Sequence, residues 1–327
     1  MRIITLEEHI SFPELTAAIP ADKREGNGMA GSAMMQAMAR KLEDITGERL
    51  QSMDDSGITL QVLSVTSSGA ELLDAGQSPA FARRYNDTIA ERIAPLPGRF
   101  AAFTHLPMTA PEAAADELER TVRQYNFRGA LINGTTQGRF LDDIQFAPIF
   151  ERAQALDVPI YLHPALPPKA VQEAYYSGLP GMAGMMLSIA GWGWHSETAL
   201  HVLRLIMAGT LDKYPRLRLI IGHMGEMLPV MMARCDNALG VERAGINKRS
   251  VSQTLKDQVY ITTSGIFTNP PLVAAIDTFG IDNILFSVDY PFSTNEQGRT
   301  FLMNAPLSPE QLKKVAYGNA ERVLKLG

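Results

Sequence analysis

Short apolar runs rich in β-branched residues alternate along almost the whole chain with longer segments of helical periodicity. The short runs predict strands at Ile3–His9, Thr59–Val65, Phe100–Pro107, Gly129–Asn133, Pro159–His163, Leu217–His223, Val259–Ser264 and Ile284–Asp289. The longer segments predict helices at Leu42–Asp55, Pro79–Ile93, Ala110–Tyr125, Phe146–Leu156, Glu197–Ala208, Glu226–Leu239, Pro271–Phe279, Ser308–Tyr317 and Asn319–Leu326. Strict alternation of strands and helices requires parallel pairing through βαβ crossovers.

This pattern favours an α/β fold, a closed (β/α)8 TIM-type barrel with loop insertions at its C-terminal face. An open doubly wound sheet is the alternative, but no Gly-x-Gly-x-x-Gly stands directly after the first strand, where that fold requires it. We expect one domain over residues 1–327. Pro13–Arg40 and Pro164–Trp194 break the alternation and are expected to be loops over the active-site mouth, or else plain surface loops or subunit contacts.

Composition narrows the classes of function. The net charge of −5 and the pI near 5.7 come with no basic stripe, so nucleic-acid binding is not expected. No apolar run reaches the roughly 18 residues of a membrane-spanning helix, and no membrane association is expected. Cys235 is the single cysteine and cannot form an internal disulfide, which fits a reducing compartment, and we expect a cytoplasmic protein.

The first predicted strand ends in a Glu-x-His pair. Alternate side chains of a strand point the same way, so Glu7 and His9 are expected to share a face while Glu8 points away. A carboxylate and an imidazole at the end of a buried strand can hold one divalent metal. The alternative is that Glu8 is the functional carboxylate and Glu7 caps a loop.

Other predicted strands end in similar side chains. His163, His223 and Asp289 stand at three more strand ends, and Glu226 begins the helix after His223. Each has a structural alternative: the histidines as satisfied core residues, the aspartate as a cap. A buried carboxylate is costly unless it is paired or bound to metal, which favours a functional Asp289.

Three further polar residues are less determined by the pattern. His195 lies in a Trp-rich segment and is a candidate for lining the pocket. Arg234, two helical turns beyond Glu226, could bind a substrate carboxylate or form a surface ion pair. His201 falls in the middle of a predicted helix and is expected to be structural.

These residues resemble the metal-dependent decarboxylases of the amidohydrolase superfamily, the branch that includes aminocarboxymuconate semialdehyde decarboxylase. Within that branch, the chain is most similar to γ-resorcylate and 2,3-dihydroxybenzoate decarboxylases. The resemblance rests on Leu6-Glu7-Glu8-His9, Arg49-Leu50, Met53-Asp54, Gly129–Gly134, Tyr161-Leu162-His163-Pro164, Gly222-His223-Met224-Gly225-Glu226, Ile261–Gly265 and Phe286–Phe292.

The resemblance implies one Zn²⁺ or Mn²⁺ held by Glu7, His9, His163 and Asp289. It also implies a His223–Glu226 pair beside the metal, an active-site arginine at Arg234, and a homodimer or homotetramer. The stretches Pro13–Arg40 and Pro164–Trp194 do not follow the resorcylate enzymes closely, so the ring substituents accepted are left open.

The expected reaction is non-oxidative decarboxylation of a small ortho-hydroxybenzoate-type acid, with Asp289 protonating the ring carbon and His223 with Glu226 handling the phenol proton or orienting the substrate. The alternative on the same residues is a hydrolase or lactonase that uses a metal-activated water. A third, non-enzymatic alternative is a barrel that serves only binding or assembly, which would require that the candidate metal ligands no longer bind a metal.

Overall fold

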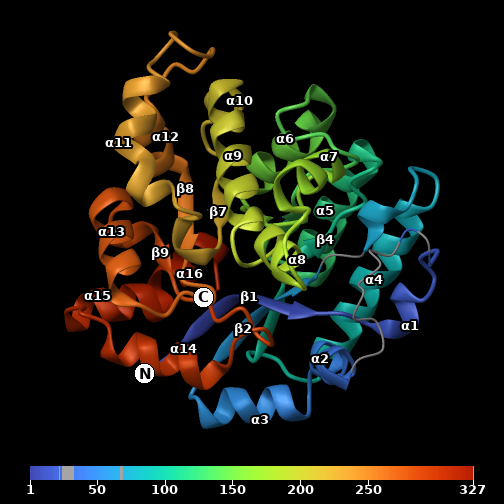
Figure 1. The fold of residues 1–327 in the computed structure, drawn as a ribbon. Coiled ribbons are helices and arrows are strands. Elements are labelled where there is room, and N and C mark those ends of the chain that lie inside the picture. The colour runs from blue at the N-terminus through green and yellow to red at the C-terminus, as the bar shows by residue number, and fades with distance from the viewer. Residues whose placement is uncertain (22, 24–32, 67–68, 327) are drawn as a thin grey trace.

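Parallel strands form the centre of the protein, which we analysed as a computed structural model describing residues 1–21, 23, 33–66 and 69–326 (Figure 1). The strands are β1 Ile4–Ile10, β2 Leu60–Val65, β3 Phe100–Ala102, β4 Thr104–His105, β5 Ala130–Asn133, β6 Ile160–His163, β7 Leu219–Ile221, β8 Val259–Thr262 and β9 Ile284–Leu285. They pair in chain order as β1-β2-β3 and β4 through β9, and every pair is parallel. The predicted α/β barrel is therefore confirmed.

Backbone hydrogen bonds connect the two sheets at both of their boundaries. Phe103, between β3 and β4, donates its N–H to the carbonyl of Leu63 at 2.9 Å, while Thr104 donates to Gly129 at 2.8 Å. On the other side, the N–H of His9 donates to the carbonyl of Tyr290 at 2.7 Å, just beyond β9. The end of β1 is thus held against the segment that carries Asp289.

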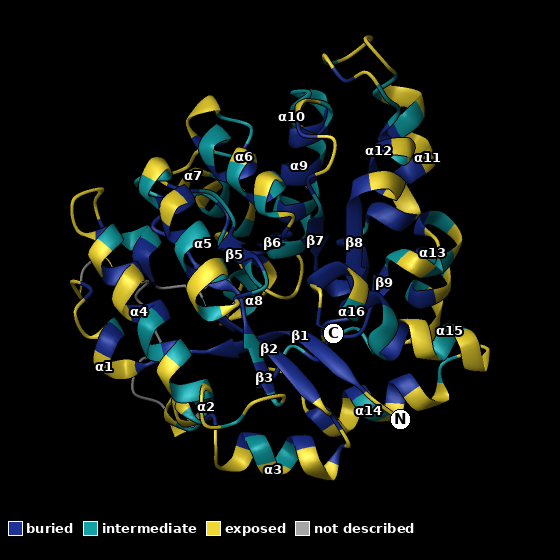
Figure 2. Ribbon diagram, turned by 180° about the vertical axis from the view of Figure 1, so that it is seen from behind, coloured by how far each residue is buried: buried dark blue, intermediate teal, exposed yellow. Residues whose placement is uncertain are grey.

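Side chains fill the inside of the strand ring and pack around its outside. One apolar cluster contains an inward residue from nearly every strand: Leu6, Val62, Phe103, Leu131, Tyr161, Ile220, Tyr260 and Leu285. A larger cluster packs the outer strand faces against the helices. Figure 2 shows the strands buried and the helices exposing their outer faces. The fold therefore leaves the strand ends, rather than the packed interior, for chemistry.

Helices follow the strands and cover the ring. They are α1 Pro13–Thr16, α2 Ala33–Glu43, α3 Glu48–Asp55, α4 Ser78–Ile93, α5 Pro111–Tyr125, α6 Ala147–Leu156, α7 Lys169–Val171, α8 Ala183–Ser188, α9 Gly193–Met207, α10 Thr210–Lys213, α11 Leu228–Ala238, α12 Val251–Gln258, α13 Asn269–Phe279, α14 Asn295–Asn304, α15 Pro309–Lys313 and α16 Asn319–Leu324. Among the described residues, no helix is long and apolar enough to cross a membrane.

Some predicted helix boundaries were wrong. The predicted helix Leu42–Asp55 is two helices, because Asp44 accepts hydrogen bonds from the N–H groups of Gly47 and Arg49 and forms a turn between them. The predicted loop Pro164–Trp194 contains α7 and α8. The loop Pro13–Arg40 contains α1 and most of α2, and its segment 24–32 lies outside the described residues.

His201 has the structural role expected of it. It lies buried in α9, and its Nε2 accepts the N–H of Leu141 at 2.7 Å, so the ring must be neutral. Burial lowers the pKa of His201 to about 4. The unfolded chain, with an ordinary histidine pKa near 6.5, then binds a proton that the folded chain excludes.

Stability should therefore fall as the pH drops from about 6.5 to about 4, with His201 contributing up to ~3 kcal/mol of the loss. His201→Gln keeps a hydrogen-bond acceptor without the titration. Urea unfolding at pH 7 and pH 4.5 should show a smaller pH difference for this variant than for the natural protein. An equal difference in both proteins would assign the pH dependence to other groups.

Candidate active site

An irregularity in β1 brings Glu7 and His9 to the inside of the barrel. The pairing with β2 runs from Leu6 opposite Val62 to Glu8 opposite Leu63, so Glu7 is an extra residue. Its φ of 76° lies in the left-handed region, as at a β-bulge. Leu6 is already an inward residue, and regular alternation after it would have turned Glu7 and His9 outward. The predicted shared face is therefore correct, and the bulge turns that face toward the inside of the barrel.

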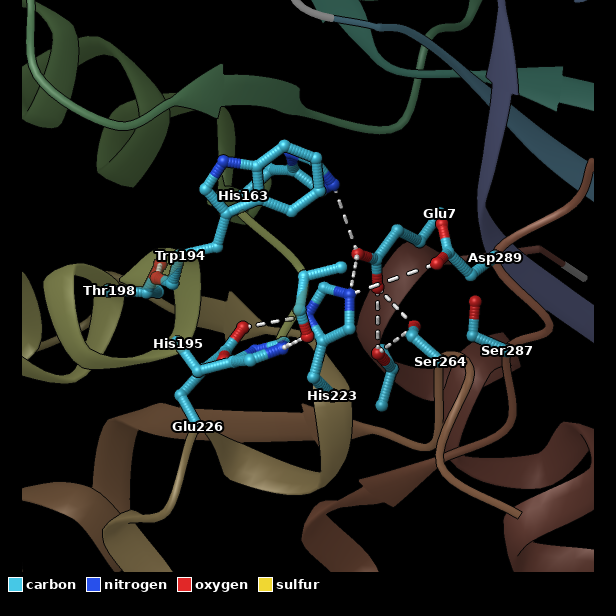
Figure 3. Close-up of polar contacts among 12 residues, drawn as sticks. Glu7, His163, Trp194, His195, Thr198, His223, Glu226, Ser264, Ser287 and Asp289 are labelled. Carbon is cyan, nitrogen blue, oxygen red and sulfur yellow. Dashed lines mark hydrogen bonds and ion pairs between the residues drawn. The ribbon is translucent and has the colours of Figure 1, made fainter. Parts of the chain in front are cut away.

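Glu7 is completely buried, and its two carboxylate oxygens have different surroundings. Hydroxyl groups of Tyr161, Thr262 and Ser264 donate to Oε2, the threonine at 3.1 Å. Oε1 has no hydrogen-bond partner and lies 3.3 Å from Nε2 of His163. The hydroxyl groups thus fix the carboxylate so that one oxygen faces the histidines (Figure 3).

Three more predicted residues meet Glu7 at the strand ends. Nε2 of His223 lies 3.6 Å from Glu7 Oε1 and 3.8 Å from Asp289 Oδ2. Nε2 of His9 lies 3.2 Å from Asp289 Oδ1, and the His9 and His163 ring centroids are 4.7 Å apart. Five residues from β1, β6 and the segments after β7 and β9 therefore converge on one small volume.

The charges of this cluster depend strongly on burial. Burial raises the pKa of Glu7, and repulsion from Asp289 adds to the rise, against the opposing effect of His223 and His9. Burial would also raise the pKa of Asp289, but the nearby imidazoles of His223 and His9 outweigh it and hold that pKa below its usual value. Asp289 is therefore ionised at neutral pH, beside a second carboxylate.

A carboxylate bridges two histidines on one side of the cluster. Glu226 contacts Nδ1 of His223 through Oε1 at 2.7 Å and Nδ1 of His195 through Oε2 at 2.6 Å. Left-handed backbone at His223, Met224 and Glu226 makes the tight turn that returns Glu226 to His223. Burial alone would lower the pKa of His223, but Glu226 and Glu7 reverse the effect and raise it well above its usual value. This arrangement favours a positively charged imidazole.

The structure brings together all but one of the predicted site residues. Glu7, His9, His163, His223, Glu226, Asp289 and His195 form one connected group. Arg234 instead lies exposed on α11, and its predicted role in substrate binding stays a prediction. The hydroxyl groups of Tyr161, Thr262 and Ser264 were not predicted. Tyr161 precedes His163 by two residues, so strand alternation could have indicated it.

The donor set fits a divalent cation. Glu7, His163, His223 and Asp289 each offer a ligand atom, and these atoms lie within 4.8 Å of one another. Glu7 Oε1 and His9 Nε2 are buried without hydrogen-bond partners, a state that is costly unless an ion is bound. Mixed imidazole and carboxylate ligands suit zinc or manganese. The grouping by distance includes His223, whose raised pKa disfavours the neutral ring that a metal ligand needs, and His9 lies beside Asp289.

The amidohydrolase family model matches residues 9–326 of this chain. The chain belongs to the amidohydrolase family. Among its curated family relatives, a γ-resorcylate decarboxylase from a Polaromonas species is 36% identical over 99% of this chain and 98% of the relative. Decarboxylase orsB from Emericella nidulans is 37% identical over 99% of this chain and 97% of its own length.

A solved amidohydrolase-family structure has the same fold. The dihydroxybenzoic acid decarboxylase from a Polaromonas species, with bound manganese and the inhibitor 2-nitroresorcinol, has a TM-score of 0.88 and 36% identity. The match covers 99% of this chain and 97% of that one. The resemblance inferred from the sequence motifs is therefore confirmed over the whole chain.

Proposed function

We propose that this protein is a metal-dependent, non-oxidative decarboxylase of an ortho-hydroxybenzoate-type acid, a carbon–carbon lyase. The observation that carries the proposal is the full-length 36% identity to a γ-resorcylate decarboxylase. The buried cluster of two carboxylates and three histidines supplies matching chemistry. The alternative, hydrolysis of an ester or lactone, fits the same side chains, but the relatives favour the decarboxylase.

Glu7, His9, His163 and Asp289 are the proposed ligands of one Mn²⁺ or Zn²⁺, and His223 faces the same volume. When bound, the cation supplies Lewis acidity that favours the phenolate form of a substrate and neutralises its carboxylate. The three hydroxyl donors on Glu7 Oε2 leave Oε1 as the oxygen that would hold the ion. Such outer contacts usually fix ligand orientation.

Asp289 is the proposed proton donor to the ring carbon that carries the carboxylate. Its lowered pKa means that it arrives at the reaction ionised and must first receive a proton. The ortho phenol of the substrate can supply that proton. Asp289 then donates this proton to the ring carbon, which forms the new C–H bond. The bond from that carbon to the carboxylate breaks, CO₂ leaves, and the electron pair of the broken bond restores the aromatic ring.

His223, Glu226 and His195 are proposed to bind and orient the substrate. Glu226 holds both imidazoles, which fixes the direction of the His223 ring toward Asp289. A positively charged His223 attracts a substrate anion. Arg234 is proposed as a further contact to the substrate carboxylate, to be tested by an increase in KM in Arg234→Ala.

The proposal is tested with protein reconstituted in Mn²⁺ or Zn²⁺. Ortho-hydroxybenzoates with different second substituents and simple lactones are supplied in parallel, and CO₂ release and ring opening are measured. We expect CO₂ from at least one acid with an ortho hydroxyl group and none from the matched para-hydroxy acid. Lactone opening without CO₂ release would replace the decarboxylase with the hydrolase.

We also propose a single-domain, cytoplasmic enzyme that forms a homodimer or homotetramer. The lone Cys235 is free and buried, as suits a reducing compartment. Tyr175, Met182, Met186 and Trp192 are exposed apolar side chains in and around α8, a composition typical of subunit contacts. Light scattering in solution measures the mass, and a monomer would contradict this assembly.

A further inference from the structure

Glu8 is a completely buried carboxylate between two proposed metal ligands, yet it faces neither the histidines nor Glu7. Its Oε1 accepts the N–H of Val288 at 3.0 Å and the hydroxyl of Ser287 at 3.2 Å. Its Oε2 accepts the N–H of Tyr290 at 3.0 Å. Both carboxylate oxygens of Glu8 thus accept hydrogen bonds from the segment that follows β9.

The two N–H groups bound by Glu8 belong to Val288 and Tyr290, the residues on either side of Asp289. Asp289 has a φ of 71°, in the left-handed region that residues other than glycine rarely adopt. Such a conformation persists only where surrounding contacts determine it. The bridge from Glu8 to residues 288 and 290 provides those contacts, because it fixes both neighbours of the strained residue.

The same end of β1 is fixed from the other side by Arg49. This buried guanidinium donates to the carbonyl of His9 at 2.5 Å and lies 4.6 Å above the ring of Tyr290. The N–H of His9 in turn donates to the Tyr290 carbonyl. β1 and the 288–290 segment are therefore tied together on both sides of the 3.2 Å approach between His9 and Asp289.

We propose that Glu8 is a positioning residue that sets the direction in which Asp289 presents its carboxyl group to the substrate. The inference rests on the proposed function, in which Asp289 delivers a proton to one ring carbon. Displacement of a reacting group by about 1 Å can cost about 100-fold in rate. Glu8 acts only through the backbone on either side of Asp289 and touches no substrate.

Glu8→Gln tests this role with little change in size. An amide has one acceptor oxygen, so either the Val288 or the Tyr290 N–H loses its partner and faces an NH₂ group. We expect kcat per metal-loaded site to fall about 10- to 100-fold, with KM changed less than about threefold and metal content unchanged. Amide hydrogen exchange should become faster in a peptide spanning residues 286–292 and stay unchanged elsewhere.

Ser287→Ala is the matched control, because it removes the hydroxyl donor to Glu8 Oε1 and leaves the hydrogen bonds from the Val288 and Tyr290 N–H groups intact. In this variant, kcat and the amide hydrogen exchange of residues 286–292 should stay near the values of the natural protein. A kcat for Glu8→Gln within about threefold of the natural protein, or an equal loss in Ser287→Ala, would overturn the inference. A role in folding alone would lower the melting temperature without changing kcat per loaded site.

If Glu8→Gln does not yield folded protein, Glu8→Asp replaces it and is judged by the same criteria, because its carboxylate is one methylene too short to reach both amides. Failure of the proposed function has a different signature: the natural protein would release no CO₂ from any hydroxybenzoate. In that event, faster exchange confined to the 286–292 peptide would support positioning of Asp289, and unchanged exchange would overturn it.

Discussion

Replacing Asp289 by asparagine is expected to lower kcat by about 10³-fold or more while one metal ion per chain is retained. Asparagine keeps an oxygen for the ion and for His9, but it cannot carry a proton from phenol to ring carbon. Initial rates of CO₂ release at saturating metal measure the effect, and elemental analysis measures the metal.

His201→Gln serves as the control for Asp289→Asn, because it changes a buried polar side chain that contacts Leu141 rather than the site. It should retain the natural rate at pH 7. A nearly natural rate for Asp289→Asn would remove Asp289 from the proton transfer and leave His223 as the next candidate donor.

Glu7→Gln is expected to weaken metal binding by at least about 100-fold and to abolish activity that added Mn²⁺ does not restore. The amide has two orientations. In one, its NH₂ group faces the ion; in the other, its NH₂ group faces the three hydroxyl groups that now donate to Oε2. Neither orientation reproduces the present contacts. Competition with a chelator measures the affinity.

Tyr161→Phe is the comparison for Glu7→Gln, since it removes one hydroxyl donor and leaves both carboxylate oxygens in place. Loss of such an outer contact typically weakens binding by about 10- to 100-fold, and excess Mn²⁺ should restore its activity. Full metal content in Glu7→Gln at natural affinity would locate the ion elsewhere.

The sequence was sufficient for the order of the strands and for the clustering of most of the candidate site residues. Parallel strands buried on both faces leave continuous apolar runs, and these runs ended in His163 and Asp289. Because the carboxyl ends of parallel strands meet at one face, side chains far apart in the chain could be expected together. The close contacts of Glu7, His163, His223 and Asp289 agree with that expectation.

Local irregularities could not be read from the same pattern. The extra residue at Glu7 depends on pairing with β2, which no property of the β1 sequence alone specifies. The helices α12 and α14 were missed because their apolar periodicity is short. Capping offered a signal: Ser250 accepts the N–H of Gln253, and Thr294 forms a capping box with Gln297.

The bulge at Glu7 also limits how this site can be transferred to another protein. Grafting the four ligand side chains onto a barrel with a regular first strand would leave two of them pointing into the helix layer. A designer would have to insert one backbone residue with the side chains, together with an anchor on the same strand, such as Glu8, that binds the segment after the last strand.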